Sequence, residues 1–531
     1  MTSTGVQPQT NSQPAPRIWP ESLLVFAISA AVYIALRSHD VLAVDGAIRA
    51  LITFNQPAEI VLGTHMLHNF WVVAWVRLLA LFSYHPADFI AYWRAAQIMN
   101  GLAAAACTGF LYDIIRRTTG SALVATFAAL AWGASHAVLL HATNSAEPLI
   151  GLLWSIFALA LTLHATRLRS YSLLILAGIS LAIAMASYRS MVFMGLACGL
   201  LTLLSPAASR WQAIRRAATL TGSFLLSLAA IFGYVAHLQG ARTLADASHS
   251  SLAVDSQSVY LALTPSKIIN AFVGYVTNLV VAVPLDYGGL RWLASHSRLN
   301  VIWLVLCSAL VLSATIALLR RSFCDTRSRA LVVSCSASFL LGFALVCCWV
   351  PTYHKLWLQP LWLIVLIASV AAGQLRFRKL LAAGIIVAAL INLAVTWQAS
   401  RGPLLYFDDA QRLAAMVNDN DLLVAGWSAS SVVYRHTFGN DRHNFDFVYH
   451  AGADGPRTLP MLAQEIAAAR ARKGHVFFLD ILDQTEQEWN GFLGEKCGVP
   501  YDSLQPFRER ATEITRFPNN RGRAVRLMLL P

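Results

Sequence analysis

Long apolar stretches recur along almost the whole of this 531-residue chain. About 11 of them approach the roughly 20 residues that a helix needs to cross a lipid bilayer. They occupy Ser22–Leu36, Phe89–Tyr112, Ala122–Leu140, Leu149–His164, Tyr171–Ala186, Met191–Leu204, Leu220–His237, Val301–Leu319, Leu331–Val350, Leu356–Ala372 and Leu381–Trp397. The sequence therefore predicts a mainly α, polytopic membrane protein with about 11 transmembrane helices.

The overall composition agrees with a membrane protein and excludes a single water-soluble domain. Hydrophobic residues make up 57% of the chain and charged residues only 13%, whereas about 25% of a soluble protein is charged. The net charge of +13 does not indicate a nucleic-acid partner, because no basic stripe with interleaved aromatic residues is present. Its Lys and Arg residues lie mostly in short segments between the apolar stretches, which is typical of loops that face anionic lipid on the cytoplasmic side.

Two further apolar stretches, Phe70–Phe82 and Ile268–Pro284, decide the topology. If neither crosses the membrane, all the basic clusters fall on the side of the N-terminus, as the positive-inside rule requires. We therefore expect both stretches to be interfacial or re-entrant helices on the outer face. The N-terminus is then cytoplasmic, and the protein is placed in a bacterial inner membrane.

The chain divides into three parts by composition. Residues 1–20, rich in Pro, Gln, Ser and Thr, are expected to be a disordered cytoplasmic segment. Residues 21–399 form the transmembrane domain, with long outer loops at 38–88 and 238–300. Residues 400–531 hold more than half of the acidic residues and are expected to fold as a soluble domain outside the cytoplasm.

The C-terminal part alternates between predicted helices and strands. Asp408–Val417 and Pro460–Arg472 suit helices, while Asp421–Trp427 and His475–Asp480 suit buried strands. The polar stretch Asn440–Arg457 is expected to be a surface loop. This alternation predicts a small α/β domain.

Two carboxylates at the expected outer membrane edge are candidates for chemistry. Asp45 follows the first apolar stretch, and Glu147 lies in the very short polar segment between the third and fourth. Asp45 suits a general base or a metal ligand, and Glu147, at the membrane surface, is expected to face a cavity or a partner. The alternatives are a helix N-terminal charge for Asp45 and a membrane-anchoring acid for Glu147. We assign Asn144, in the same segment as Glu147, to substrate binding.

Histidines and cations form the second group of candidates. His65 and His68 have a spacing that places both rings on one helix face, where they could bind a metal ion. A polar interfacial face is the preferred explanation, and one of the two could instead bind a substrate phosphate or acceptor hydroxyl. Arg189 is expected to pair with Glu147 or with an anionic head group, or to extend to the interface. His354 and Lys355 lie within an aromatic segment between two late apolar stretches, where a cation suits a lipid-linked phosphate.

This layout resembles the GT-C superfamily of membrane glycosyltransferases, which contains protein mannosyltransferases and the bacterial aminoarabinose and rhizobial lipopolysaccharide sugar transferases. The similarity comes from a first helix followed by a long outer loop with Asp45, the segment His65–His68, the short loop with Glu147, the late segment Trp349–Trp357 and a terminal soluble domain. The acids in these loops are single here, whereas many members carry pairs. The Arg/Lys-Tyr order often seen in the late loop is replaced by Tyr353-His354-Lys355.

The resemblance implies an enzyme of the cell envelope that transfers a sugar from a polyprenyl-phosphate donor to a lipid, glycan or protein acceptor. Asp45 would be the catalytic base, and Glu147 a second acid that holds metal or acceptor. Lys355, with His354 or Arg189, would contact the donor phosphate. No cofactor is predicted with certainty, and a divalent metal is left open.

Three other functions stay open at this stage. A secondary transporter or flippase would use broken helices and ionisable residues near mid-membrane. A glycan polymerase or ligase of the O-antigen type would use a large loop such as residues 238–300. An inactive scaffold would keep the layout and bind partners through its C-terminal domain.

Overall fold

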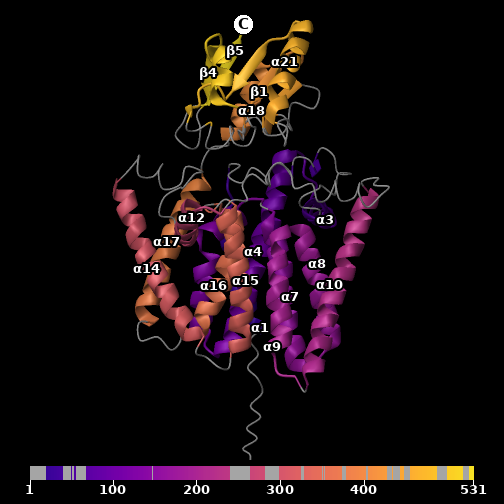
Figure 1. Cartoon of the computed structure of the whole chain (residues 1–531), viewed down its shortest axis with the longest axis vertical. Coiled ribbons are helices and arrows are strands. Elements are labelled where there is room, and N and C mark those ends of the chain that lie inside the picture. The colour runs from indigo at the N-terminus through magenta and orange to yellow at the C-terminus, as the bar shows by residue number, and fades with distance from the viewer. Residues whose placement is uncertain are drawn as a thin grey trace, which may run out of the picture.

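The computed structural model describes residues 19–39, 50, 53–54, 67–145, 147–207, 209–238, 263–280, 298–323, 328–349, 351, 353–372, 378–401, 405–426, 433–434, 443–447, 455–486, 489, 499–517 and 525–531. These residues form a bundle of helices with a small sheet domain at one end (Figure 1). The helices of the bundle are α1 (Trp19–Ala35), α3 (His68–Ala80), α4 (Phe89–Thr119), α5 (Ala122–Gly133), α6 (His136–Ala142), α7 (Pro148–Leu168), α8 (Tyr171–Ser187), η1 (Arg189–Val192), α9 (Phe193–Leu204), α10 (Arg210–Leu238), α12 (Pro265–Leu279), α14 (Arg298–Ser322), α15 (Arg329–Cys348), α16 (His354–Ala372) and α17 (Arg378–Ala399).

Seven helices of the described residues are long and apolar enough to cross a membrane, namely α4, α7, α10, α14, α15, α16 and α17. The pair α5 and α6, bent by 65°, is an eighth if both count as one span. Three shorter apolar segments, α1, α8 and Arg189–Leu204, make the difference between eight and the predicted 11. The multi-pass helical class is thus confirmed, and the number 11 stays a prediction.

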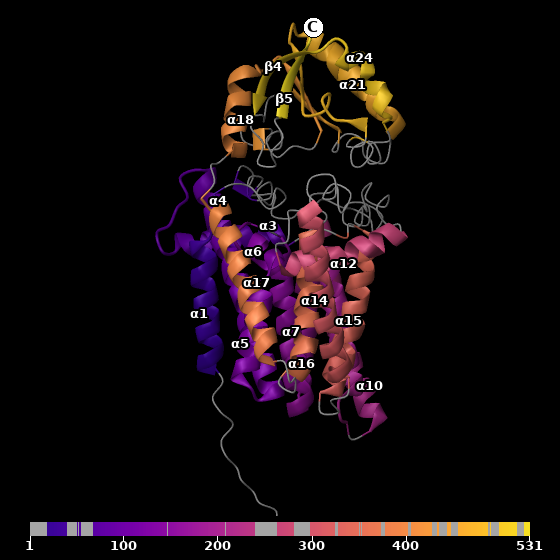
Figure 2. The same cartoon turned by 90° about the vertical axis from the view of Figure 1, so that its left-hand side faces the viewer.

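The two ambiguous apolar stretches form α3 and α12, which have 13 and 15 residues. Neither is among the candidate spans of the described chain. Both lie at the end of the bundle that faces the sheet domain (Figures 1 and 2).

Basic side chains gather at the other end of the bundle. Helices α4, α7 and α14 end there with arginines in their last turns, and α10, α15 and α17 begin there with Arg210, Arg329 and Arg378. We call this the basic end, and the opposite end, next to the sheet domain, the domain end. The single-sided clustering is the arrangement that the sequence predicts for short basic loops.

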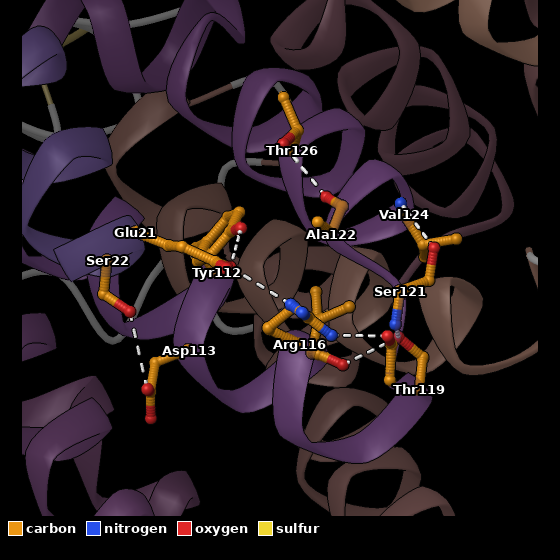
Figure 3. A network of polar contacts seen from close by, with 12 residues as sticks. Glu21, Ser22, Tyr112, Asp113, Arg116, Thr119, Ser121, Ala122, Val124 and Thr126 are labelled. Atoms are coloured by element: carbon orange, nitrogen blue, oxygen red, sulfur yellow. Dashed lines mark hydrogen bonds and ion pairs between the residues drawn. The ribbon is translucent and has the colours of Figure 1, made fainter. Parts of the chain in front are cut away.

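An acidic side chain joins α1 to α4 at the basic end (Figure 3). Glu21 accepts hydrogen bonds from the Tyr112 hydroxyl at 2.6 Å and from Arg116 Nε at 3.1 Å. Beside it, Arg117 donates to Asp113 at 2.7 Å. Every polar group of this cluster therefore lies close to a partner of complementary charge or hydrogen-bonding capacity.

The C-terminal domain is built on a five-stranded sheet with the order β2-β1-β3-β5-β4. Strands β2, β1 and β3 are parallel, and β5 and β4 are added antiparallel. The elements are α18 (Leu405–Met416), β1 (Leu422–Ala425), β2 (His443–Asp446), α21 (Gly455–Ala471), β3 (Val476–Leu479), η4 (Tyr501–Leu504), α24 (Gln505–Arg508), β4 (Thr512–Phe517) and β5 (Val525–Leu530).

The strands alternate between two apolar cores, as side chains of a buried sheet do. Leu422 and Val424 of β1 pack in the core that contains Leu462 of α21, and Leu423 packs in the core that contains Leu413 of α18. Helices therefore cover both faces, and the predicted α/β class is confirmed.

One sequence prediction for this domain is wrong. The expected surface loop Asn440–Arg457 contains the strand β2, which pairs with β1 from His443 to Asp446, and α21 already begins at Gly455. The short strand His-Asn-Phe-Asp lies at the edge of the sheet, and Phe445 together with Phe447 just after it is buried in the core. This alternation is a strand pattern, but the polar residues around it favoured a loop in the prediction.

The sheet domain contacts the bundle through α18. The ring of Phe407 lies 5.4 Å from that of Phe89 and 6.2 Å from that of Trp93, both in the first turns of α4. These contacts hold the domain against the end of the bundle where the candidate residues gather.

Candidate functional site

The bend between α5 and α6 shapes the domain end. α5 ends at Gly133, where a Cβ atom would lie only 2.9 Å from the Tyr33 hydroxyl. Breaking a helix frees backbone carbonyls, which must find other donors inside a bundle. Asn392 of α17 supplies one, since its amide donates to Ala134 O at 2.8 Å and to Leu279 O at 2.7 Å. The bend is therefore built into the packing of α17 and α12, and it leaves α6 buried in the bundle.

A buried ion pair lies just beyond α6. Lys355 Nζ, in the first turn of α16, is 3.6 Å from Glu147 Oε2, at the start of α7. The Glu147 side chain is 2% exposed and that of Lys355 is 15% exposed. The ammonium also lies 4.8 Å from the centre of the Tyr353 ring. Two predicted site residues from distant parts of the sequence are thus brought together.

Three histidines lie in the neighbourhood of this ion pair. The His354 ring packs edge-on against His136 with 5.0 Å between their centres, and His354 Nδ1 is 2.7 Å from Asn278 Oδ1 of α12. His141 lies within electrostatic reach of Glu147, Lys355 and both other histidines. It is buried, and neither of its ring nitrogens has a hydrogen-bond partner among the described residues.

The short segment before Glu147 is held from several sides. Asn100 donates to Asn144 O at 3.0 Å, and Trp93 donates to the Ser145 hydroxyl at 2.8 Å. Asn144 donates to Leu140 O at 2.7 Å, while its own Oδ1 is buried without a partner in the described part of the chain. The predicted substrate-binding residue Asn144 therefore lies two residues after the end of α6. Its amide oxygen accepts no hydrogen bond from the described residues.

Arg189 is placed in η1, next to the first turn of α7. Gly151 makes this approach possible, because a Cβ atom there would lie 3.0 Å from Tyr188 Cβ and 3.1 Å from Ala184 O. The sequence suggested Arg189 as a partner of Glu147, and the structure places Lys355 beside Glu147 as an ion-pair partner. Arg189 is half-buried. His68 begins α3 and is buried beside the end of α8, where Leu67 N donates to Ala186 O at 3.1 Å.

Two predicted site residues cannot be placed. Asp45 and His65 lie outside the described residues, so their roles stay predictions from the sequence. Among the residues that are described, no group of three His, Cys, Asp or Glu side chains is arranged to hold a metal ion.

The sequence reasoning missed His136, His141 and Asn278. Both histidines lie inside the apolar stretch Ala122–Leu140 or one residue beyond it. Ionisable residues within a spanning segment are rare and usually face a cavity or a partner, so they carried a signal that was available from the sequence. Asn278 had no such signal, because it lies in an ordinary amphipathic helix.

Comparisons with known proteins identify the fold. No family model and no curated protein sequence matches the chain. A crystal structure of ArnT from Cupriavidus metallidurans bound to undecaprenyl phosphate matches 97% of this chain and 98% of its own, with a TM-score of 0.54 and 12% identity. The archaeal oligosaccharyltransferase AglB from Archaeoglobus fulgidus, in complex with an inhibitory peptide and a dolichol-phosphate, matches 96% of this chain and 74% of its own, with a TM-score of 0.54 and 12% identity.

These two proteins have the GT-C fold, and the likeness covers nearly the whole chain. The predicted resemblance to the GT-C superfamily is therefore confirmed as a fold.

Proposed function

We propose that this protein is a membrane glycosyltransferase that moves a sugar from a polyprenyl-phosphate-type lipid to a lipid, glycan or protein acceptor. The reaction takes place at the domain end, which faces the outside of the inner membrane. The basic end then faces the cytoplasm, in agreement with the positive-inside rule. Support for a lipid-phosphate donor comes from the fold, since the similar structures hold undecaprenyl phosphate and dolichol-phosphate.

The buried ion pair between Glu147 and Lys355 carries the proposal. A distance of 3.6 Å is longer than a direct charge-assisted hydrogen bond of about 2.8 Å. Burying two charges costs free energy, and ionisable residues buried in a membrane bundle usually face a partner or a substrate pathway. A buried ammonium beside an acid at the domain end suits a site that receives a lipid-linked phosphate, since its three N–H donors match the phosphate oxygens.

In the proposed mechanism, Lys355 stabilises the lipid phosphate as it leaves the anomeric carbon of the sugar. Glu147 holds the ammonium in place and in its charged form, and His354, fixed by Asn278, borders the same position. Asp45 accepts the proton of the acceptor hydroxyl that attacks the anomeric carbon, so the configuration is inverted. Asn144, His65, His68 and Arg189 contribute to binding the acceptor or the lipid head group.

A transfer assay tests this function. Membrane vesicles containing the protein are given undecaprenyl phosphate that carries a radiolabelled hexose or pentose, and the label is followed into lipid and glycan fractions. We expect Asp45→Asn to lower transfer by about 100-fold and Asp40→Asn, at the start of the same loop, to leave transfer unchanged. Full transfer by the Asp45 variant would overturn its assignment as the base.

The α5–α6 bend supports a second candidate, a flippase or transporter, because broken helices with polar groups are common at transport sites. The two functions differ in what happens to the carrier. A transferase releases free undecaprenyl phosphate, whereas a flippase changes only the leaflet of the intact donor. Labelled donor that becomes accessible on the other leaflet without loss of its sugar would favour the second candidate.

A further inference from the structure

A pocket of about 390 Å³ opens at the basic end, away from the candidate site described above. It lies between the last turns of α4, α7 and α9 and the first turn of α15. Its lining consists of Thr118, Leu163, Thr166, Arg167, Arg169, Leu201, Ser205, Pro206, Ser328, Ala330 and Leu331. No acidic residue is among them. With about 30 Å³ for each water molecule of a liquid, the volume holds a group the size of a phosphate ester.

The polar side of the pocket suits an anion. Arg167 and Arg169 are exposed cations, and no ion pair is formed by either of them within the described chain. Ser205 and Ser328 are more than nine-tenths buried, and their hydroxyls form no hydrogen bond with the described residues. Both serines line the pocket, so an occupant with acceptor oxygens would complete their hydrogen bonding.

Helix α15 adds further donors. It has 20 residues, and its N-cap residue Ser328 makes no side-chain capping hydrogen bond. The backbone N–H groups of the first turn and the positive end of the helix dipole therefore face the pocket wall formed by Ser328–Leu331. Such uncapped helix ends are common binding sites for phosphate groups.

A third cation lies next to Pro206 of the pocket lining. Arg216 of α10 is 1% exposed and donates to Pro206 O at 3.4 Å, while its Nη2 atom has no partner among the described residues. Pro206 itself lines the pocket. No ion pair of Arg216 is formed within the described residues, so its buried guanidinium raises the positive potential of this corner and favours an anionic occupant.

We propose that this pocket binds the phosphate of a phosphate ester. Arginine and an uncapped helix end both suit the tetrahedral oxyanion, and the apolar side chains of Leu163, Leu201 and Leu331 suit the carbon part of the molecule. An anionic phospholipid head group or a soluble phosphorylated compound can supply this chemistry. The proposal is independent of the transferase function and concerns the opposite end of the bundle.

Two variants separate binding from folding. Arg169 has φ 56° in the left-handed region, which glycine adopts without a steric penalty, so Arg169→Gly removes a cation and is expected to keep or raise the melting temperature. Ser328→Asp places a good N-cap residue at α15 and a negative charge in the pocket. Arg321→Gln, at the basic end but outside the pocket lining, is the matched control.

The test uses the full-length protein, purified in non-ionic detergent and stripped of lipid. Native mass spectrometry measures binding of phosphatidylglycerol, with phosphatidylcholine as the neutral comparison, and of glycerol 3-phosphate as the soluble probe. We expect both pocket variants to lower the affinity for one of the anionic probes by on the order of tenfold, the effect of losing one charge-assisted contact. The control variant should bind both probes with unchanged affinity. A preference for phosphatidylglycerol identifies a lipid, and one for glycerol 3-phosphate a soluble compound. Unchanged binding in both variants, or an equal loss in the control, would overturn the proposal.

Discussion

The two ends of the helix bundle each hold an acid–base pair, and the pairs differ in burial and in the distance between the charged groups. At the basic end, Glu21 is 40% exposed and lies 3.1 Å from Arg116, and it also accepts a short hydrogen bond from Tyr112 (Figure 3). At the domain end, Glu147 is 2% exposed and lies 3.6 Å from Lys355. The more buried pair is the looser one.

This difference separates a structural contact from a candidate binding site. Burying a pair of charges costs free energy, so a deeply buried pair is weak evidence for a stabilising contact. The pair at the domain end is the more buried one, and near it lies His141, whose ring nitrogens have no hydrogen-bond partner among the described residues. We infer that the basic-end pair joins α1 to α4, whereas the domain-end pair is kept for a ligand.

Neutralising Glu147, the acid of the domain-end pair, should have the largest effect. We expect Glu147→Gln to lower transfer by about 100-fold or more and stability by about 3 kcal/mol, because the buried Lys355 ammonium loses its acidic neighbour at 3.6 Å. Transfer is measured in vesicles and stability by thermal unfolding in detergent. Normal transfer by the Glu147 variant would remove the functional half of the comparison.

Removing both charges of the domain-end pair should separate stability from activity. The double variant Glu147→Gln, Lys355→Met removes both charges of the pair, so we expect it to regain about 1–3 kcal/mol relative to Glu147→Gln alone. Transfer should stay as low as in the single variant. If stability and transfer recovered together, the pair would be a folding device rather than part of a site.

His141 offers a test that does not involve a charge pair. A buried imidazole without hydrogen bonds is unfavourable, so His141→Leu should keep or raise the melting temperature while transfer falls by on the order of tenfold. His164→Leu is the control, since His164 lies in α7 and its Nδ1 is 3.1 Å from Ala160 O. Equal transfer by both variants would place His141 outside the site.

The smallest effect is expected at the basic end. Glu21→Gln removes a partly exposed carboxylate that accepts two hydrogen bonds, which should cost about 1 kcal/mol of stability. Transfer should be unchanged, because the pair lies at the opposite end from the candidate site. A large loss of transfer would show that the two ends are coupled.

The sequence predicted the helices well because the hydropathy of each apolar stretch is by itself enough to indicate a helix in a membrane. The bend between α5 and α6 was not predicted, since it depends on Asn392, which donates to Ala134 O from 258 residues away. Glu147 and Lys355 were both predicted as site residues, but their pairing was not. A contact between residues on two different helices produces no regular spacing in the sequence. The strand β2 was missed for a different reason, since the alternation of polar residues with the buried Phe445 and Phe447 was present in the sequence but the polar residues around it favoured a loop.

The central claim is that the domain-end pair binds a lipid phosphate, and the affinity for undecaprenyl phosphate tests it most directly. Native mass spectrometry compares Lys355→Met with Arg116→Met, which removes the cation of the basic-end pair. We predict that the Lys355 variant binds at least about tenfold more weakly and that the Arg116 variant binds like the unmodified protein. Equal affinities for the two variants would contradict the account.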